Sequence, residues 1–310
     1  MKKIEKIDCE GKEYPKKLLA IKNSPKIIYA IGNISLLNSN KKSIAIIGSR
    51  DCTEYGRNTA FKFANSLAKA GNTIISGMAI GIDAVSHIGA MEEIGRTIAV
   101  LGGGFNKIYP KQNEWLFYEI IKNKGCIISE YEPNEEASSE KFLQRNRIVS
   151  GLSDAVLVVE AEYRSGTSVT AKIAKEQNKI LFAVPSNLES KNGIGTNKLL
   201  QEGAKIAIDY KDIIKELKTK NEKIKSKKMQ ENLEIVNENK EYIELKEEYK
   251  PIYNLLLSNP KNINELSKML DVSISKLNSI LTFMQIEGIV KQLPGNEFIV
   301  NGESKCIKNM

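Results

Sequence analysis

Apolar residues in this chain occur in short unbroken runs, and the stretches between the runs repeat apolar positions at helical spacing. A parallel strand that helices cover on both faces is apolar at every position rather than at every second one. The runs therefore predict buried parallel strands at 44–47, 73–75, 97–101, 126–129, 155–159 and 179–184. A helix over 55–70 is indicated by apolar residues at helical spacing, namely Ala60, Phe63, Ala64, Leu67 and Ala68.

The alternation of such strands with amphipathic helices predicts a doubly wound α/β fold. We expect an extended Rossmann-like domain with a mostly parallel sheet over 1–212, and we expect residues 1–43 to pack onto it as an N-terminal extension. Cysteines are few and widely spaced, and His87 is the only histidine, so neither disulfides nor a zinc site is expected.

Beyond this domain the composition changes to Lys, Glu and Asn over 213–245, which is typical of a solvated helix or a flexible linker. A charged arm with its own binding role is the alternative. Regular patterning resumes over 246–302, with three helical stretches and two strands around Pro294 and Gly295. That order predicts a small C-terminal winged-helix domain.

Four of the predicted strands end in glycine-containing turns, at 48–50, 76–77, 102–104 and 165–167. A turn that leads from a strand into a helix leaves backbone N–H groups free at the positive end of the helix dipole. Such a turn favours an anion. Four of them at one edge of a parallel sheet predict a phosphate-binding rim.

The formal net charge is +8 and the isoelectric point is near 9.0. Most of the excess positive charge lies within the first 210 residues, where the glycine turns are. A polyanionic partner fits this balance, although lysine-rich proteins also carry it as plain solvated surface. No apolar run approaches the length that spans a bilayer, so we expect a cytoplasmic protein without a membrane partner.

Arg50 stands at the mouth of the first glycine turn. Its guanidinium can present two N–H groups to a phosphate while the backbone of Gly48 and Ser49 approaches closely. A surface ion pair with Asp51 is the alternative.

The segment 141–147 combines cations with an aromatic side chain. Such a combination can neutralise phosphates and stack a base. The candidate DNA-binding residues here are Lys141, Phe142, Arg145, Asn146 and Arg147. The alternative places Phe142 in the core and uses Arg145 and Arg147 to brace the sheet through acidic partners.

Ser165, Gly166 and Thr167 precede a helix that we expect to begin near Val169. Their hydroxyls and N–H groups could hold a phosphate, but capping of the helix explains them as well.

Enzyme motifs are weak in this chain. The turn after the first strand lacks the second and third glycines of a dinucleotide-binding fingerprint, and no P-loop pattern occurs. Asp83 and His87 are spaced for a proton-transfer pair, but no nucleophile elbow accompanies them, and a structural pair explains them better. We therefore expect no enzymatic activity and no cofactor.

Five motifs carry a family resemblance. In chain order they are 44–50 (IAIIGSR), 76–83 (SGMAIGID), 97–104 (TIAVLGGG), 145–152 (RNRIVSGL) and 165–167 (SGT). Together they resemble the DNA-processing protein A (DprA/Smf) family. The resemblance implies a protein that binds single-stranded DNA, protects it from nucleases and loads the RecA recombinase onto it during natural transformation. It also implies a homodimer and no catalysis.

Two other classes stay open. The nucleotide-processing LOG-type phosphoribohydrolases also use glycine-rich strand ends to hold a phosphate, but Gly102–Gly104 here continues without their Thr and catalytic Glu. A winged-helix transcription regulator is the other class. It needs several cations on the second helix of the C-terminal domain, where this chain offers only Lys276.

Overall fold

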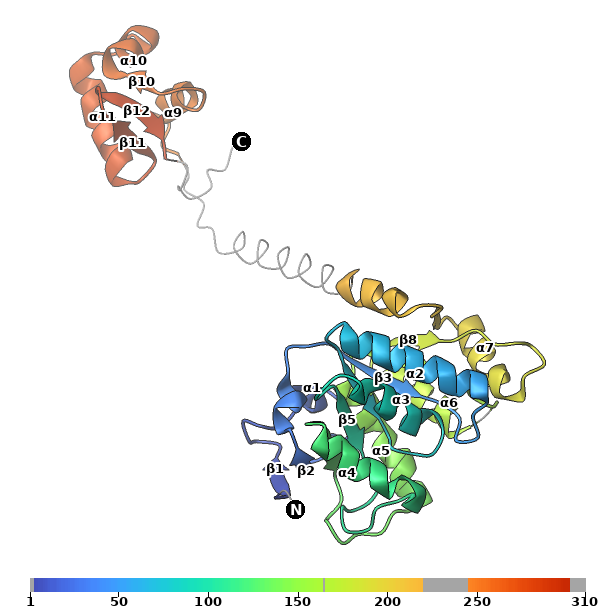
Figure 1. The fold of residues 1–310 in the computed structure, drawn as a ribbon. Coiled ribbons are helices and arrows are strands. Elements are labelled where there is room, and N and C mark those ends of the chain that lie inside the picture. The colour runs from blue at the N-terminus through green and yellow to red at the C-terminus, as the bar shows by residue number, and fades with distance from the viewer. Residues whose placement is uncertain (1–2, 164, 220–244, 302–310) are drawn as a thin grey trace. The chain divides into compact units, whose positions relative to one another are not determined.

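The computed structural model describes residues 3–163, 165–219 and 245–301. The chain divides into two compact units, residues 1–221 and 222–310 (Figure 1). Each unit has its own hydrophobic core. Most of the predicted linker, residues 220–244, lies outside the described residues. The chain is helical from 210 to 219, and Ile213 and Leu217 are buried in the core of the first unit. Structured chain therefore continues past residue 212.

The first unit is built on one sheet of nine strands in the order β1-β2-β6-β5-β4-β3-β7-β8-β9. All pairs from β6 to β9 are parallel, whereas β1 with β2 and β2 with β6 are antiparallel. This confirms the predicted α/β fold with a mostly parallel sheet. The strands are β1 (Glu5–Asp8), β2 (Ile27–Gly32), β3 (Ser43–Ile47), β4 (Thr73–Ser76), β5 (Thr97–Val100), β6 (Cys126–Ser129), β7 (Ala155–Val158), β8 (Ile180–Ala183) and β9 (Lys205–Ile206).

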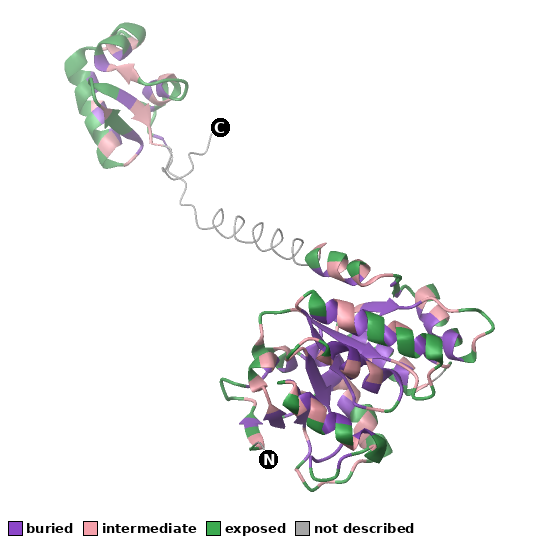
Figure 2. Ribbon diagram, viewed as in Figure 1, coloured by how far each residue is buried: buried purple, intermediate pink, exposed green. Residues whose placement is uncertain are grey.

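Helices cover both faces of the sheet, which is why the central strands are apolar at every position (Figure 2). Ile44 and Ile46 of β3 pack in the same core cluster as α2, and Ala45 and Ile47 pack in the same cluster as α5 and α6. The helices are α1 (Lys16–Leu19), α2 (Glu54–Lys69), α3 (Ile82–Met91), α4 (Glu114–Lys122), α5 (Ser139–Leu152), α6 (Gly166–Glu176) and α7 (Ile194–Gln201), with 3-10 turns η1 (Ile34–Asn38), η2 (Lys111–Asn113) and η3 (Lys191–Gly193).

The strand order reverses between β3 and β7. From β3 the chain proceeds outward through β4, β5 and β6, and it then returns to place β7 on the other side of β3. In open parallel sheets, the loops at the carboxyl ends of the two strands at such a switch point diverge and leave a crevice where ligands bind. A ligand-binding crevice is therefore expected between the turns after β3 and β7.

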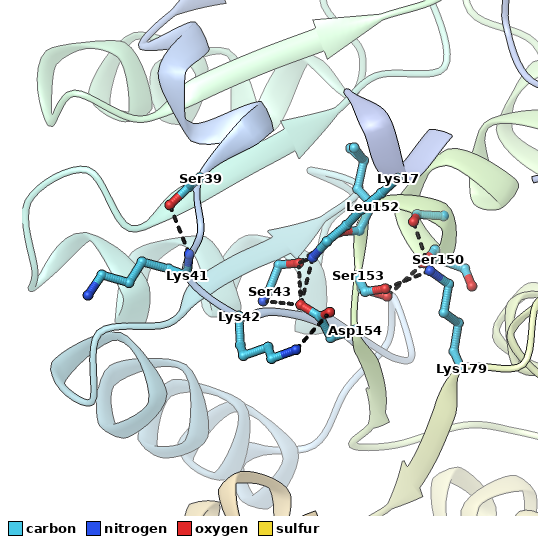
Figure 3. A network of polar contacts seen from close by, with 11 residues as sticks. Lys17, Ser39, Lys41, Lys42, Ser43, Ser150, Leu152, Ser153, Asp154 and Lys179 are labelled. Carbon is cyan, nitrogen blue, oxygen red and sulfur yellow. Dashed lines mark hydrogen bonds and ion pairs between the residues drawn. The ribbon is translucent and has the colours of Figure 1, made fainter. Parts of the chain in front are cut away.

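The N-terminal segment adds two strands to the sheet. A polar network around Asp154 also fastens it through Lys17, Lys42 and Ser43 (Figure 3). The Asp154 carboxylate accepts hydrogen bonds from Lys17 Nζ at 2.6 Å and from the Ser43 backbone N–H at 2.9 Å. Lys42 pairs with it at 3.6 Å. Burial alone raises the pKa of this carboxyl, but Lys17, Ser43 and Lys42 together hold the pKa below its ordinary value.

The second unit contains α9 (Lys250–Leu256), β10 (Lys261–Asn262), α10 (Ile263–Leu270), α11 (Ile274–Ile286), β11 (Val290–Leu293) and β12 (Glu297–Val300). Its three strands form an antiparallel sheet in the order β10-β12-β11. Buried Leu266, Leu277 and Phe298 bring α10, α11 and β12 into one core. The assignment of this unit as a winged helix stays a prediction.

None of the helices in the described ranges combines the length and the apolar character that crossing a membrane requires.

Candidate nucleic-acid interface

A cavity of about 540 Å³ opens at the switch point of the sheet. Its wall is formed by the turns that follow β3, β4 and β7, and by residues on α5. Of the predicted site residues, this cavity brings together Gly48, Ser49, Arg50, Phe142, Arg145, Asn146, Ser165, Gly166 and Thr167. Lys141 and Arg147 are not among its lining residues.

At three of the four glycine turns, one backbone N–H group is already hydrogen-bonded within the protein, and this corrects the expectation that the turns leave their N–H groups free. The Ser49 N–H donates to the Glu160 carbonyl at 2.8 Å, and the Gly104 N–H donates to the Glu135 carbonyl at 2.8 Å. The Gly77 N–H donates to the Asp83 carboxylate at 3.1 Å. Loops from elsewhere in the chain satisfy the donors at Ser49 and Gly104, which sequence spacing cannot show, whereas Asp83 on α3 lies only six residues from Gly77.

The turn at 102–104 does not line the cavity at all. A side chain on Gly102 would overlap the ring of Phe142, and a side chain on Gly104 would overlap backbone carbonyls of Glu132 and Pro133. These glycines serve close packing under the loop that leads into α5. The predicted rim of four turns is therefore wrong, and the cavity uses the turns after β3, β4 and β7.

Phe142 and Arg50 both line the cavity, and their side chains contact each other. The Arg50 guanidinium carbon lies 5.5 Å from the centroid of the Phe142 ring. The centroid of the Tyr109 ring lies 5.4 Å from that of Phe142, and the two ring planes are inclined by 35°. Phe142 is half-buried rather than enclosed in the core, and Arg50 is exposed. Among the described residues, Arg50 forms no ion pair, so the alternative pair with Asp51 is not seen. An exposed guanidinium over an aromatic ring can contact a phosphate and a base together.

Arg145 corrects a second expectation, because it is 4 % exposed and cannot act as a surface cation. Its guanidinium donates to the carbonyl of Gly77 at 2.6 Å and to the carbonyl of Val100. It thereby ties the ends of β4 and β5 together beneath the cavity. Burial lowers the pKa of Arg145, and the charge of buried Asp83 opposes that effect. Burial likewise raises the pKa of Asp83, against the charge of Arg145.

Arg147 and Lys141 are held by acidic partners. Arg147 pairs with Glu130 at 2.5 Å and donates to the Asn23 carbonyl at 2.9 Å, so it braces the N-terminal extension. Lys141 pairs with Glu135 at 3.0 Å. For Arg147 the structure therefore favours the bracing role. Lys141 keeps a quarter of its side chain exposed.

The turn after β7 leads directly into α6, which begins at Gly166 rather than near Val169. Ser165 is the N-cap residue, but its side chain makes no capping hydrogen bond. The Ser165 hydroxyl oxygen is buried and has no hydrogen-bond partner among the described residues. The capping explanation for Ser165 is therefore not supported. The first residues of α6 line the cavity, and their N–H groups lie at the positive end of the helix dipole, an arrangement that suits an anion.

The expected pair of Asp83 and His87 is wrong. His87 Nδ1 lies 2.6 Å from the Thr97 hydroxyl, whereas Asp83 accepts from the Gly77 N–H. Burial, and to a smaller extent the charge of Arg145, lower the pKa of His87 to about 3. A histidine in this state is neutral at physiological pH. Sequence reasoning also missed Tyr109, which lines the cavity and lies against Phe142.

The chain is similar to several proteins of known family. Residues 6–218 match the family model described as DNA recombination-mediator protein A. The chain is 38 % identical over 218 residues to the DNA processing protein DprA of Bacillus subtilis, which covers 70 % of this chain and 73 % of that protein. It is 37 % identical over 211 residues to the protein Smf of Escherichia coli, which covers 68 % of this chain and 56 % of that protein.

Two solved structures are similar as well. The X-ray structure of DNA processing protein A from Streptococcus pneumoniae matches with a TM-score of 0.65 and 34 % identity, over 69 % of this chain and 74 % of that one. A structure of DNA processing protein A from Helicobacter pylori, a protein with a unique single-stranded DNA binding mode, matches with a TM-score of 0.63 and 32 % identity, over 71 % of this chain and 99 % of that one. The family match and these relatives confirm the resemblance, and the chain belongs to the DNA recombination-mediator protein A (DprA/Smf) family.

Proposed function

We propose that this protein binds single-stranded DNA in the cavity between the turns after β3 and β7. The observation that carries the proposal is the contact between exposed Arg50 and half-buried Phe142 in a cavity that the N-terminus of α6 also lines. A phosphate placed there meets a guanidinium and the positive end of a helix dipole, while a neighbouring base can stack on Phe142. None of these contacts reads base identity, so the binding is independent of sequence.

The H. pylori relative binds single-stranded DNA, and this supports the same ligand class for the present chain. Within this proposal, Gly48, Ser49, Asn146 and Thr167 shape the cavity, and Lys141 contributes a charge at its approach. Arg145 and Arg147 act as braces rather than as phosphate contacts. In this proposal the protein performs no chemistry on the DNA.

The test is a fluorescence-anisotropy titration of a mixed-sequence single strand and the matching duplex over a range of salt concentrations. We expect tighter binding of the single strand, and Arg50→Ala should weaken it and reduce the salt slope by about 0.7 to 1. Arg96→Ala is the matched control, because Arg96 precedes β5 and so lies at the opposite edge of the sheet. An unchanged slope for Arg50→Ala, or an equal fall for Arg96→Ala, contradicts this site.

We further propose that the bound strand is handed to the RecA recombinase in the cytoplasm, during DNA uptake and recombination, and that the protein acts as a homodimer with a C-terminal winged-helix domain. Family membership supports this role. The chain spans only 56 % of the length of the E. coli relative and 52 % of the Synechocystis one, so the activity of the whole protein is part of the proposal. RecA filament assembly on a strand coated with single-strand binding protein should accelerate with the wild-type protein and not with Arg50→Ala.

A further inference from the structure

An exposed stripe of aromatic and basic side chains runs along η2 and α4. Lys111, Trp115, Tyr118 and Lys122 follow one another at spacings of four, three and four residues, which places them on one face of a continuous helical segment. Trp115 and Tyr118 are each 51 % exposed, whereas Leu116, Phe117 and Ile120 on the opposite side of α4 are buried. The opposite face of α4 packs onto the protein, and this packing leaves the rings of Trp115 and Tyr118 half-exposed.

The stripe begins beside the cavity. Tyr109 lines the cavity, is exposed, and precedes η2 by two residues. The Asn113 side chain, at the junction of η2 and α4, donates to the Met78 carbonyl at 2.9 Å. Met78 lies between Gly77 and Ala79, which both line the cavity. The start of α4 is therefore tied to the wall of the cavity, and Tyr109, whose ring lies against Phe142, precedes the stripe by two residues.

The stripe offers two accessible ammonium groups, although each is paired with a carboxylate. Lys111 and Lys122 stand at its two ends with side chains 72 % and 74 % exposed. Glu114 and Glu119 pair with them at 3.4 Å and 3.1 Å, but exposed pairs of this kind contribute little and leave the ammonium groups accessible to a phosphate. Aromatic rings between cations are the combination that single-strand binding surfaces use, because every base has a face that can stack.

We infer that Trp115 and Tyr118 form a second contact site for single-stranded DNA, which takes bases of the same strand after it leaves the cavity past Phe142 and Tyr109. This inference rests on the proposed function, since it extends the path of the strand whose phosphate occupies the cavity. Trp115 and Tyr118 lie about 4.5 Å apart along the helix axis, so they contact neighbouring positions of the strand. A strand too short to leave the cavity does not reach them.

Trp115 is the only tryptophan of the chain, so its intrinsic fluorescence reports on this site without a label. The experiment titrates the full-length protein with thymidine homopolymers of graded length, from about 4 to 16 nucleotides, the range of site sizes of single-strand binding folds. We expect short strands to bind without changing the tryptophan emission, and longer strands to quench it and to bind more tightly.

Trp115→Ala and Tyr118→Ala should each weaken binding of the longer strands about 5- to 150-fold, the range that loss of one stacked base implies, and leave binding of the shortest strands unchanged. Trp115→Phe is the matched control, because it keeps an aromatic face and should retain most of the affinity. Emission that stays unchanged while anisotropy shows a saturated long strand overturns the inference, as does wild-type affinity of Trp115→Ala at every length. The stripe then serves a different contact, such as a protein partner.

Failure of the proposed function gives a different result. In that case the wild-type protein does not bind strands of any length, or Arg50→Ala binds strands of every length as tightly as the wild type does. Loss of length-dependent tightening in Trp115→Ala, together with loss of binding at all lengths in Arg50→Ala, supports both sites at once.

Discussion

The guanidinium of Arg145 occupies the space that a side chain on Gly77 would need. A Cβ at Gly77 would overlap three atoms of that guanidinium, and the Arg145 group is itself bonded to the carbonyl of Gly77. The glycine of the second turn therefore has a packing role. It lets a buried cation cross beneath the cavity and hold the ends of β4 and β5.

We predict that Gly77→Ala lowers the free energy of unfolding by about 1–3 kcal/mol, since overpacking a filled core costs that much. It should also weaken DNA binding, because Arg145 must move and the wall formed by 77–79 moves with it. Urea unfolding measures the first effect and anisotropy the second. In an Arg145→Met background the cost of Gly77→Ala should shrink, because the overlapping guanidinium is gone. An equal cost in both backgrounds contradicts this account.

Gly166 gives the opposite prediction, because a Cβ there would meet open space. Gly166 is the first residue of α6, where alanine is at least as favourable as glycine. Gly166→Ala should therefore leave the stability unchanged or raise it slightly. If a phosphate approaches the backbone at this helix end, the added methyl group should weaken single-strand binding. A variant that is fully stable and binds DNA as tightly as the wild type removes the start of α6 from the site.

Arg147 should behave as a structural residue. It bridges Glu130 and the Asn23 carbonyl, and both members of the ion pair are mostly buried. We predict that Arg147→Ala lowers the free energy of unfolding by about 1.5–3 kcal/mol, the range for a lost hydrogen bond to a charged group. The salt slope of DNA binding should stay as in the wild type. Glu130→Gln should also lower the free energy of unfolding and leave the salt slope unchanged. A salt slope reduced by about 1 in Arg147→Ala would instead show that Arg147 contacts a phosphate of the DNA.

The positions of the central strands could be predicted because burial on both faces leaves an unbroken apolar run. Strand β6 lies where the sequence predicts it, and helix α2 begins and ends one residue from the prediction over 55–70. The antiparallel addition of β2 could not be predicted. It depends on pairing Tyr29 with Ser129, which is one hundred residues away and leaves no local signal.

The candidate site was predictable in outline, since Arg50, Phe142 and Ser165 follow or face glycine turns at the carboxyl edge of the sheet. The burial and the bonding partners of each side chain were not predictable. Arg145 and Arg147 are two residues apart in the same cationic segment, but one is buried under Gly77 and the other is paired with Glu130. Long-range partners decide both outcomes. A long-range partner also decides the state of the Ser49 N–H, because this group donates a hydrogen bond to the Glu160 carbonyl.

His87 should make the stability of the protein depend on pH well above the range in which carboxylates titrate. Its pKa is about 3 in the folded protein because it is buried, against about 6.5 in an unfolded chain. Between these values the unfolded state binds more protons than the folded state, so stability falls as pH falls below about 6.5. The loss approaches an order of 1.4 kcal/mol per pH unit. Asp83 contributes a slope of the opposite sign at pH values above the ordinary carboxyl pKa, because burial raises its pKa and the folded state there binds more protons.

The measurement is urea unfolding between pH about 7.5 and about 4, for the wild type and for His87→Gln. The variant loses the contact with Thr97 and should be less stable at neutral pH. Its stability should nevertheless fall less steeply with acidification, because glutamine has no proton to gain on unfolding. The difference between the two curves isolates the imidazole from Asp83 and from every other carboxyl, since both proteins share those groups. Parallel curves would mean that His87 is already protonated in the folded protein, and its burial next to Arg145 makes that state costly.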